Sequence, residues 1–151
     1  MAIEAYRHRL PLRVRWAEVD LQGVVFNGHY LTYADVCATE YWRAIGVPYP
    51  AGFADLDIDA FVRKATLEYH APARYDDELL LCGRMARLGR SSADFSVSMF
   101  RADDTSRPLV DATVVYVCVD RRGAPAAWPA ALRERMRRFE AIAPVEAAAG
   151  A

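Results

Sequence analysis

The segment from His29 to Ile45 constrains the fold more than any other part of the chain, because its apolar residues repeat with the period of an α-helix. They follow one another at steps of three or four positions: Tyr30, Ala34, Cys37, Tyr41 and Ile45. Leu31, Ala38 and Trp42 widen this apolar stripe. Gly46 and Pro48 follow in the order that ends a helix sharply. The pattern predicts a buried helix that the rest of the chain must cover.

Strand-like segments supply that cover. Within Tyr6–Ala17, apolar residues alternate with arginines, which indicates a half-buried strand. Four further runs are rich in residues that suit a pleated sheet: Phe61–His70, Glu78–Leu88, Ser92–Arg101 and Leu109–Asp120. Their connections are short, so we expect neighbouring runs to pair antiparallel as a meander. The pattern also predicts a short helical turn in the excursion Pro50–Asp59 and a second helix over Trp128–Ile142.

These elements predict an α+β fold with an antiparallel sheet wrapped around the long helix. The chain has 151 residues, of which 54% are hydrophobic, so it suffices for one domain, which we place at residues 1–142. Residues 143–151 are predicted to be a disordered tail. One sheet covers only one side of an apolar helix. We therefore expect a second copy of the chain to cover the rest, as a symmetric dimer.

Charge and composition exclude several partners. The chain has 19 basic and 20 acidic residues and a net charge of −1, so no positive field exists to attract nucleic acid. The segment Met1–Leu10 lacks the apolar core typical of a signal peptide, and the sequence has no run of 18 apolar residues, so we expect a cytoplasmic protein without a membrane partner. The three cysteines, Cys37, Cys82 and Cys118, are far apart among apolar neighbours and are interpreted as reduced core residues.

The loop before the long helix carries the residues best suited to chemistry. Backbone N–H groups at a helix start point outward, and those of Asn27, Gly28 and His29 are placed to hold an anion or polarise a carbonyl. Asp20 lies a few residues earlier. A carboxylate beside such an oxyanion site suits acyl transfer, with Asp20 attacking the acyl carbon or orienting a water. The alternative is structural, because Asp and Asn also cap turns.

Three segments, Arg15–Tyr30, Glu68–Leu79 and Gly89–Ser92, resemble the 4-hydroxybenzoyl-CoA thioesterase family of hotdog-fold acyl-CoA thioesterases. The resemblance spans roughly Leu12–Asp120. In that family a D-x-D-x-x-G-x-V loop supplies the catalytic aspartate as its second acid, which falls on Asp20. Its carbonyl-polarising amide falls at or beside Asn27. The first acid is replaced by Glu18 here.

The resemblance implies a hotdog fold, active sites shared across a dimer interface, and hydrolysis of an acyl-CoA to a free acid and CoA. Aryl-CoA substrates such as hydroxybenzoyl-CoA are included. It implies no metal and no cofactor, since CoA is part of the substrate. Whether Asp20 is nucleophile or general base stays open, because both roles need the same residue. Dimer and tetramer also both remain open.

Further substrate contacts are predicted around this core. Asp35 matches, by ungapped counting, a helix aspartate of the hydroxybenzoyl-type members that faces the far end of the acyl group; the alternative is a surface aspartate. His29 is a candidate because Gly28 precedes it. For the phosphates of CoA we predict Arg90, Ser91 and Ser92. Alternatives are Arg63, Lys64, Arg74 and Arg87, whereas His70 is interpreted as a structural residue.

Two other functions are kept as alternatives. A hotdog enoyl-CoA hydratase or dehydratase needs a histidine beside a carboxylate, which His29 offers. A non-catalytic acyl-CoA-binding module would keep the pocket without hydrolysis. The acyl preference depends on the depth of the pocket, for which Trp42, Phe53 and Phe61 are the candidate determinants.

Overall fold

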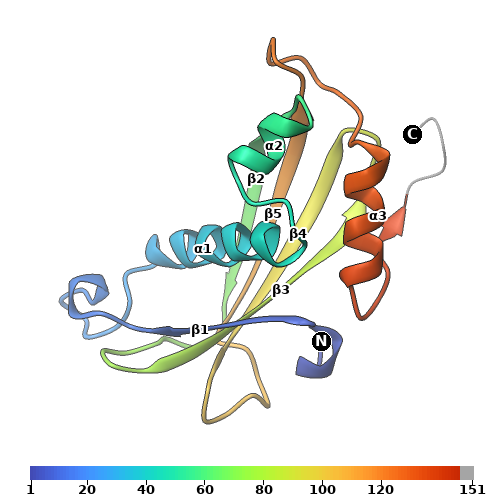
Figure 1. The fold of residues 1–151 in the computed structure, drawn as a ribbon. Coiled ribbons are helices and arrows are strands. Elements are labelled where there is room, and N and C mark those ends of the chain that lie inside the picture. Colours follow the sequence, from blue (N-terminus) through green and yellow to red (C-terminus); the bar gives the residue numbers. More distant parts are fainter. Residues whose placement is uncertain (147–151) are drawn as a thin grey trace.

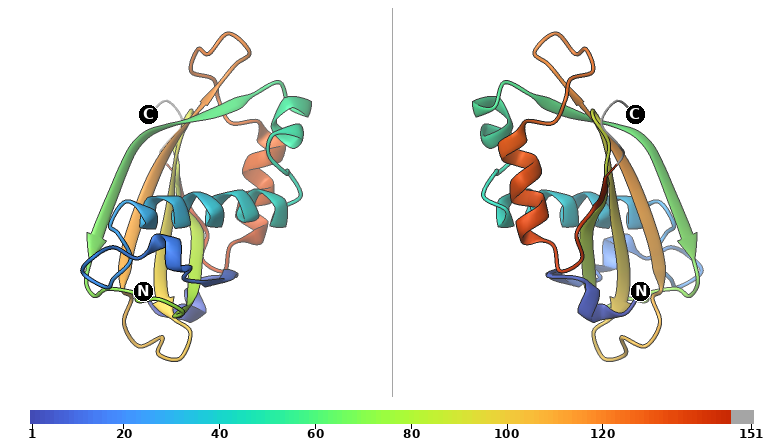
Figure 2. Two further views of the ribbon diagram at one scale, coloured as in Figure 1. Left: turned by 90° about the vertical axis from the view of Figure 1, so that its left-hand side faces the viewer. Right: turned by 90° about the vertical axis from the view of Figure 1, so that its right-hand side faces the viewer.

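Helix α1 (His29–Ala44) crosses one face of a six-stranded sheet in the computed structural model, which describes residues 1–146 (Figure 1). The sheet curves around the helix, and α2 (Ala51–Asp55) and α3 (Ala130–Phe139) lie beyond the C-terminal end of α1 (Figure 2). Short 3-10 turns form at Ile3–Ala5 and Trp16–Glu18. The α+β architecture of a sheet wrapped around a central helix, predicted from the sequence, is confirmed.

The strands lie in the order β1-β3-β4-β5-β2, with β6 beside β3. Their bounds are His8–Arg13 (β1), Asp59–Tyr69 (β2), Glu78–Leu88 (β3), Ser92–Arg101 (β4), Val110–Val119 (β5) and Val145–Glu146 (β6). All neighbours pair antiparallel except β3 and β6, which are parallel. The predicted strands are therefore all present, with β3 and β4 at their predicted bounds.

The predicted meander is correct for β3, β4 and β5 but wrong for β2, which pairs with β5 rather than with β3. The connection 70–77 carries the chain from one side of the sheet to the other. Three strand spacings amount to about 14 Å. Eight extended residues span about 26 Å, which suffices for this crossing. A connection of this length can therefore form either a hairpin or a crossover between two strands that are not neighbours, as it does between β2 and β3.

The prediction of a disordered tail from residue 143 is wrong for residues 143–146. Val145 and Glu146 form β6, and the carboxylate of Glu146 accepts hydrogen bonds from Arg137 Nε and Nη2, both at 2.7 Å. Pro144 is buried. The strand pairing and this ion pair hold the segment against β3 and α3. Residues 147–151 lie outside the described part of the chain.

Helix α1 packs closely on the sheet at its middle. Gly83 of β3 faces the helix, and a Cβ atom built there would lie 2.6 Å from Cζ of Phe95 and 2.8 Å from Sγ of Cys37. The core between helix and sheet contains fully buried large side chains, among them Tyr33, Tyr41, Leu81, Met85, Phe95 and Met99. All three cysteines are buried and free, as predicted. After α1, Gly46 has φ +83°, a left-handed conformation that ends the helix one residue before the predicted position.

Strand β2 forms one edge of the sheet, and most of its side chains are exposed. The exposed set includes the apolar side chains of Phe61, Val62 and Tyr69, at 57%, 55% and 53%. Such an edge offers unpaired backbone groups and apolar surface together. Within residues 1–146, no helix has the length and apolar character needed to cross a membrane.

Candidate active site

Asp20 stands at the start of a tight loop between the 3-10 turn Trp16–Glu18 and helix α1. Val19 and Val25 form an isolated antiparallel bridge across the loop. The amide of Asp20 donates to Val24 O at 3.0 Å, and that of Gly23 donates to Asp20 O at 2.9 Å. Gly23 has φ +78°, which a residue with a side chain rarely adopts. The glycine of the motif therefore serves the turn that presents Asp20.

Glu18, the other acid of the motif, is buried and has a structural role. Its carboxylate accepts hydrogen bonds from Arg15 N at 2.8 Å and Arg15 Nη2 at 2.7 Å. Burial opposes ionisation, but these hydrogen bonds outweigh it and hold the pKa of Glu18 below its usual value. The carbonyl of Glu18 also accepts from Phe26 N at 2.9 Å. Glu18 thus fixes both ends of the loop around Asp20.

Asp20 itself is half-buried and lines a pocket of about 290 Å³. Its Oδ1 accepts a hydrogen bond from Gln22 N at 2.8 Å. Its Oδ2 has no partner within residues 1–146. The pocket lies between the Asp20 loop and the end of β2, and is lined by Asp20, Gln22, Val24, Val25, Asn27, Tyr30, Tyr69, His70, Ala71 and Pro72. The structure therefore brings together Asp20 and Asn27, as predicted.

Of the three amides predicted to be unpaired, that of His29 is not, because it donates to Phe26 O at 3.0 Å. This hydrogen bond closes the turn at the start of α1, so the amide of His29 is not free to bind a substrate. The amides of Asn27 and Gly28 have no acceptor in the part of the chain that the structure describes. Gly28 has φ −66°, so its backbone does not require glycine. An added Cβ atom would lie 3.1 Å from Cε1 of Phe26.

Two tyrosines of the pocket were missed as site residues. Tyr30 fits the apolar stripe of the helix and was assigned to the core, but its hydroxyl accepts a hydrogen bond from Ala73 N at 3.0 Å. Burial, Tyr69 and nearby carboxylates, including Asp20, raise the pKa of Tyr30. The hydroxyl of Tyr69 donates a hydrogen bond to Asn27 O at 3.3 Å. The rings of Tyr30 and Tyr69 lie edge to face, with centroids 5.7 Å apart. The position of Tyr30, directly after the loop that carries Asp20 and Asn27, is the feature of the sequence that could have identified it as a pocket residue.

Asp35 and the acyl-pocket candidates lie elsewhere in the chain. Asp35 is exposed and borders a second pocket, of about 210 Å³, which Trp42 and Phe53 also line. Burial raises the pKa of Tyr116 in this pocket, and the Asp35 carboxylate adds to the rise. Phe61 borders a different hollow, beside α2 and the end of β5. Within one chain, Asp20 and Asp35 therefore belong to separate pockets.

The predicted phosphate contacts Arg90, Ser91 and Ser92 lie at the far end of β3. The Asp20 loop is joined to Ala73, just before β3, by a hydrogen bond from Val25 N at 2.9 Å. An eleven-residue strand separates the two ends by about 30 Å. The carbonyls of Arg90 and Ser91 accept hydrogen bonds from Trp128 N and Cys118 N. Within one chain, the structure does not bring this turn to Asp20.

The histidines near the pocket are held by neighbours. His29 lies edge to face against Phe26, with centroids 5.9 Å apart, and does not line the pocket. His70 lines it, but its Nε2 is 2.9 Å from Asp111 Oδ2. Ser98 donates to the other Asp111 oxygen at 2.5 Å. Within residues 1–146, no three His, Cys, Asp or Glu side chains form a metal-binding cluster.

The amino-acid sequence is similar to those of known thioesterases and esterases. A family model described as the thioesterase superfamily matches residues 22–107. The acyl-CoA thioester hydrolase YbgC of Shigella flexneri is 34% identical over 112 residues, which is 74% of this chain and 81% of YbgC. A putative esterase of Aquifex aeolicus is 31% identical over 91 residues, or 60% of this chain and 70% of the esterase.

Solved structures are similar over most of the chain. A protein of Pseudomonas aeruginosa superposes with a TM-score of 0.81 at 27% identity, covering 93% of this chain and 96% of that protein. A thioesterase of Thermus thermophilus, solved with coenzyme A and Zn, gives a TM-score of 0.78 at 26% identity, covering 92% and 98%. A gentisyl-coenzyme A thioesterase gives 0.73 at 19% identity and is similar in fold.

Proposed function

The chain belongs to the thioesterase superfamily, and on this premise we propose that it is an acyl-CoA thioester hydrolase whose catalytic carboxylate is Asp20. The observation that supports this most is the shared pocket of Asp20 and Asn27. A carboxylate oxygen of Asp20 and the backbone amide of Asn27 have no partner within residues 1–146, and the amide of Gly28, the next residue in the chain, has none there either. Thioester hydrolysis needs a carboxylate of this kind and an oxyanion site.

The reaction proceeds by one of two routes. As a general base, Asp20 takes a proton from water, the water oxygen bonds to the thioester carbon, and the amides of Asn27 and Gly28 stabilise the oxyanion. The carbon–sulfur bond then breaks, and the CoA thiolate takes the proton from Asp20. As a nucleophile, Asp20 bonds to the acyl carbon and displaces the thiolate; water then hydrolyses the anhydride to the free acid and the Asp20 carboxylate, and the proton released by this step goes to the thiolate. In a single turnover in ¹⁸O-water, ¹⁸O in Asp20 identifies the second route with water attacking the carboxyl carbon of Asp20. The first route labels only the free acid, as does attack of water on the acyl carbon of the anhydride, and trapping of the anhydride by hydroxylamine distinguishes these two.

Replacing Asp20 by Asn tests the assignment. We expect CoA-thiol release from a panel of aryl-CoA and straight-chain acyl-CoA thioesters to fall by about a hundredfold or more. The matched control is Asp55→Asn, since Asp55 is an exposed carboxylate of α2 outside every pocket described above. Release of no thiol by the wild type from any thioester, or full activity of Asp20→Asn, would contradict the proposal.

A hydratase is the weaker candidate. It needs an imidazole free to exchange a proton beside Asp20, and the predicted one, His29, does not line the pocket. The similarity to named thioester hydrolases supports catalysis over a binding module.

We also propose that a second copy of the chain completes the site along the exposed edge of β2. The Asp20 pocket lies at the C-terminal end of β2, which supplies Tyr69. The Asp35 pocket lies at its N-terminal end, which supplies Ala60 and Val62. Antiparallel pairing of two β2 strands sets the C-terminal end of one beside the N-terminal end of the other. The Asp20 pocket then faces Asp35 of the partner subunit, in position to meet the far end of the acyl group.

A further inference from the structure

The free edge of β2 carries charges of opposite sign on either side of its centre (Figure 2). Arg63 and Lys64 precede the centre, and Glu68 follows it. All three side chains are exposed, and none of them has a charged partner within residues 1–146. When a second β2 strand runs antiparallel beside the first, the basic part of each faces the acidic part of the other. The edge is therefore complementary to itself.

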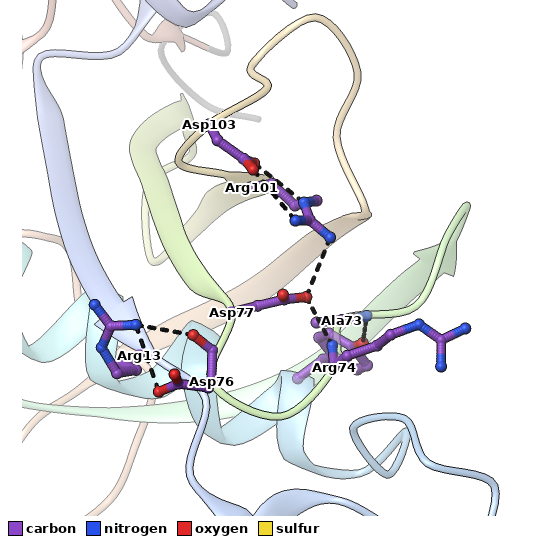
Figure 3. A network of polar contacts seen from close by, with 8 residues as sticks. Arg13, Ala73, Arg74, Asp76, Asp77, Arg101 and Asp103 are labelled. Carbon is purple, nitrogen blue, oxygen red and sulfur yellow. Dashed lines mark hydrogen bonds and ion pairs between the residues drawn. The ribbon is translucent and has the colours of Figure 1, made fainter.

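The charges that follow β2, in contrast, are paired within the chain. Asp77 Oδ2 accepts hydrogen bonds from Arg74 N at 2.8 Å and from Arg101 Nη1 at 3.4 Å (Figure 3). Asp76 pairs with Arg13 at 3.5 Å. These contacts fix the connection after β2 and leave the charges of the strand itself without partners in the described part of the chain.

Glu68 also lies beside a second carboxylate. The register of β2 and β5 sets it directly opposite Asp111, on the face of the sheet away from α1, since the residues on either side of Asp111 belong to the core. Ser98 donates to Asp111 Oδ1 at 2.5 Å, and His70 Nε2 lies 2.9 Å from Oδ2, but neither contacts Glu68. Like charges directly opposite each other destabilise a sheet. A cation brought to Glu68 across the free edge offsets this repulsion.

Lys64 is the cation in the right position. It lies four residues before Glu68 and on the same face of β2. In an antiparallel pair of β2 strands centred on Thr66, Lys64 of each strand is directly opposite Glu68 of the partner subunit. Facing side chains in such a pair have Cβ atoms about 4.5–5.5 Å apart, which allows an ion pair to form.

The same register joins the two pockets. The ladder between β2 and β5 skips one residue, so that Val62 lies three ladder positions before Thr66 and Tyr69 lies three positions after it. Val62 lines the Asp35 pocket, and Tyr69 lines the Asp20 pocket. Pairing centred on Thr66 sets Val62 of the partner subunit opposite Tyr69, on the face that carries α1. The charges on one face and the pockets on the other thus select the same alignment.

We propose that two copies of the chain pair along β2 with Thr66 of each at the two-fold axis, so that Lys64 and Glu68 form an ion pair with the partner subunit twice. This inference rests on the dimer proposed above and specifies its register. Moving the axis to a neighbouring residue shifts the partner by two positions and separates both ion pairs. Exposed ion pairs contribute little free energy, but they discriminate between alternative alignments.

Charge reversal tests the ion pairs. Lys64→Glu and Glu68→Lys each set like charges opposite one another twice in a dimer of the variant alone. We expect sedimentation to show the dimer Kd of each variant raised about tenfold or more. An equimolar mixture of the two variants is expected to restore the wild-type dimer fraction and thiol release, because an acidic edge then faces a basic edge. The control is Glu4→Lys, at an exposed carboxylate of the turn Ile3–Ala5, which is expected to sediment as the wild type does.

Cysteine crosslinking tests the register itself, since the three native cysteines are buried. Mild oxidation is expected to link two copies of Thr66→Cys, whose Cβ atoms lie within about 5 Å of each other at the axis. Ala65→Cys is the matched control, because its own counterpart is a diagonal neighbour about 7–8 Å away, beyond the reach of a disulfide.

The outcomes separate the proposals. The register is wrong if a dimeric protein links at residue 65 and not at residue 66, or if mixing the two charge variants restores no dimer. A wild type that sediments as a monomer overturns the register together with the proposed pairing. A wild type that dimerises and links at residue 66 but hydrolyses no thioester overturns the proposed function alone.

Discussion

Glu18 and Asp20 are two carboxylates two positions apart, and their surroundings give them different roles. Glu18 is 7% exposed and its oxygens are bound by Arg15. Asp20 is half-buried with one oxygen on Gln22 N, and it lines a pocket. A carboxylate already saturated with hydrogen bonds is a poor base or nucleophile. These contacts give Glu18 a structural role and leave Asp20 as the candidate for catalysis, a difference that the spacing of the motif does not reveal.

The burial of His8 makes the stability of the fold depend on pH. It is 8% exposed, and its Nε2–H donates to Cys37 O at 3.0 Å. Burial lowers the pKa of His8 below 6.5 in the folded chain. The unfolded chain therefore takes up this proton first, and the stability from neutral His8 is lost as the pH falls below about 6.5.

Urea unfolding of wild type and His8→Gln at pH 7.5, 6.5 and 5.5 measures this contribution. We expect the wild type to lose its advantage over the variant towards pH 5.5. Burial raises the pKa of Glu140, so Glu140 acts in the opposite direction, but it is present in both chains and cancels in the difference. A difference that stays constant across the three pH values would refute the assignment.

At the scale of elements, α1 and β3 approach closely because small residues face each other. Gly83 leaves room for Cys37 and for the ring of Phe95, all fully or nearly fully buried. This contact sets the position of α1 on the sheet. Since the N-terminal end of the same helix supplies Tyr30 and follows the amides of Asn27 and Gly28, the contact also positions the candidate site.

Gly83→Ala is expected to destabilise the fold by about 1–3 kcal/mol, because the added Cβ atom overpacks a core that cannot yield easily. Its contacts would be 2.6 Å from Phe95 Cζ and 2.8 Å from Cys37 Sγ. Chemical denaturation gives the free energy of unfolding. Combining it with Cys37→Ala is expected to cost less than the sum of the two single changes. Strict additivity would show that the two residues do not compete for the same space.

At the scale of the whole molecule, β2 is an edge of the sheet whose side chains are mostly exposed within the described residues. Strand β2 exposes most of its side chains, and the two pockets lie at its opposite ends. In the proposed dimer, a second copy paired along β2 would bury this edge and join the two kinds of pocket. The proposed dimer therefore serves both stability and the site.

Phe61→Lys tests this arrangement, since Phe61 is 57% exposed on β2. A lysine in the proposed interface is expected to shift the protein from a dimer to a monomer of 16.9 kDa in sedimentation, with loss of thiol release. The control is Val145→Lys, because Val145 is 70% exposed on β6 next to β3. A wild type that sediments as a monomer would refute the proposed pairing.

The sequence by itself determined most of the elements and singled out Asp20 as the candidate catalytic carboxylate. The spacing of apolar residues, Gly46 and Pro48 predict α1 to within one residue, and alternation predicts β3 and β4 at their bounds. Asp20 and Asn27 were predicted as site residues from the loop before α1 and from its resemblance to a family. In the structure both line the same pocket. These signals are local, because periodicity and helix ends depend on residues a few positions apart.

Only the tertiary structure decided which parts of the chain are neighbours. It paired β2 with β5, ordered residues 143–146 beside β3, and bonded the amide of His29 to Phe26. It also separated Asp35 and the turn Arg90–Ser92 from Asp20 within one chain, and made Tyr30 and Tyr69 walls of the pocket. Contacts between distant segments depend on how the whole sheet closes around the helix, which no short pattern in the sequence encodes.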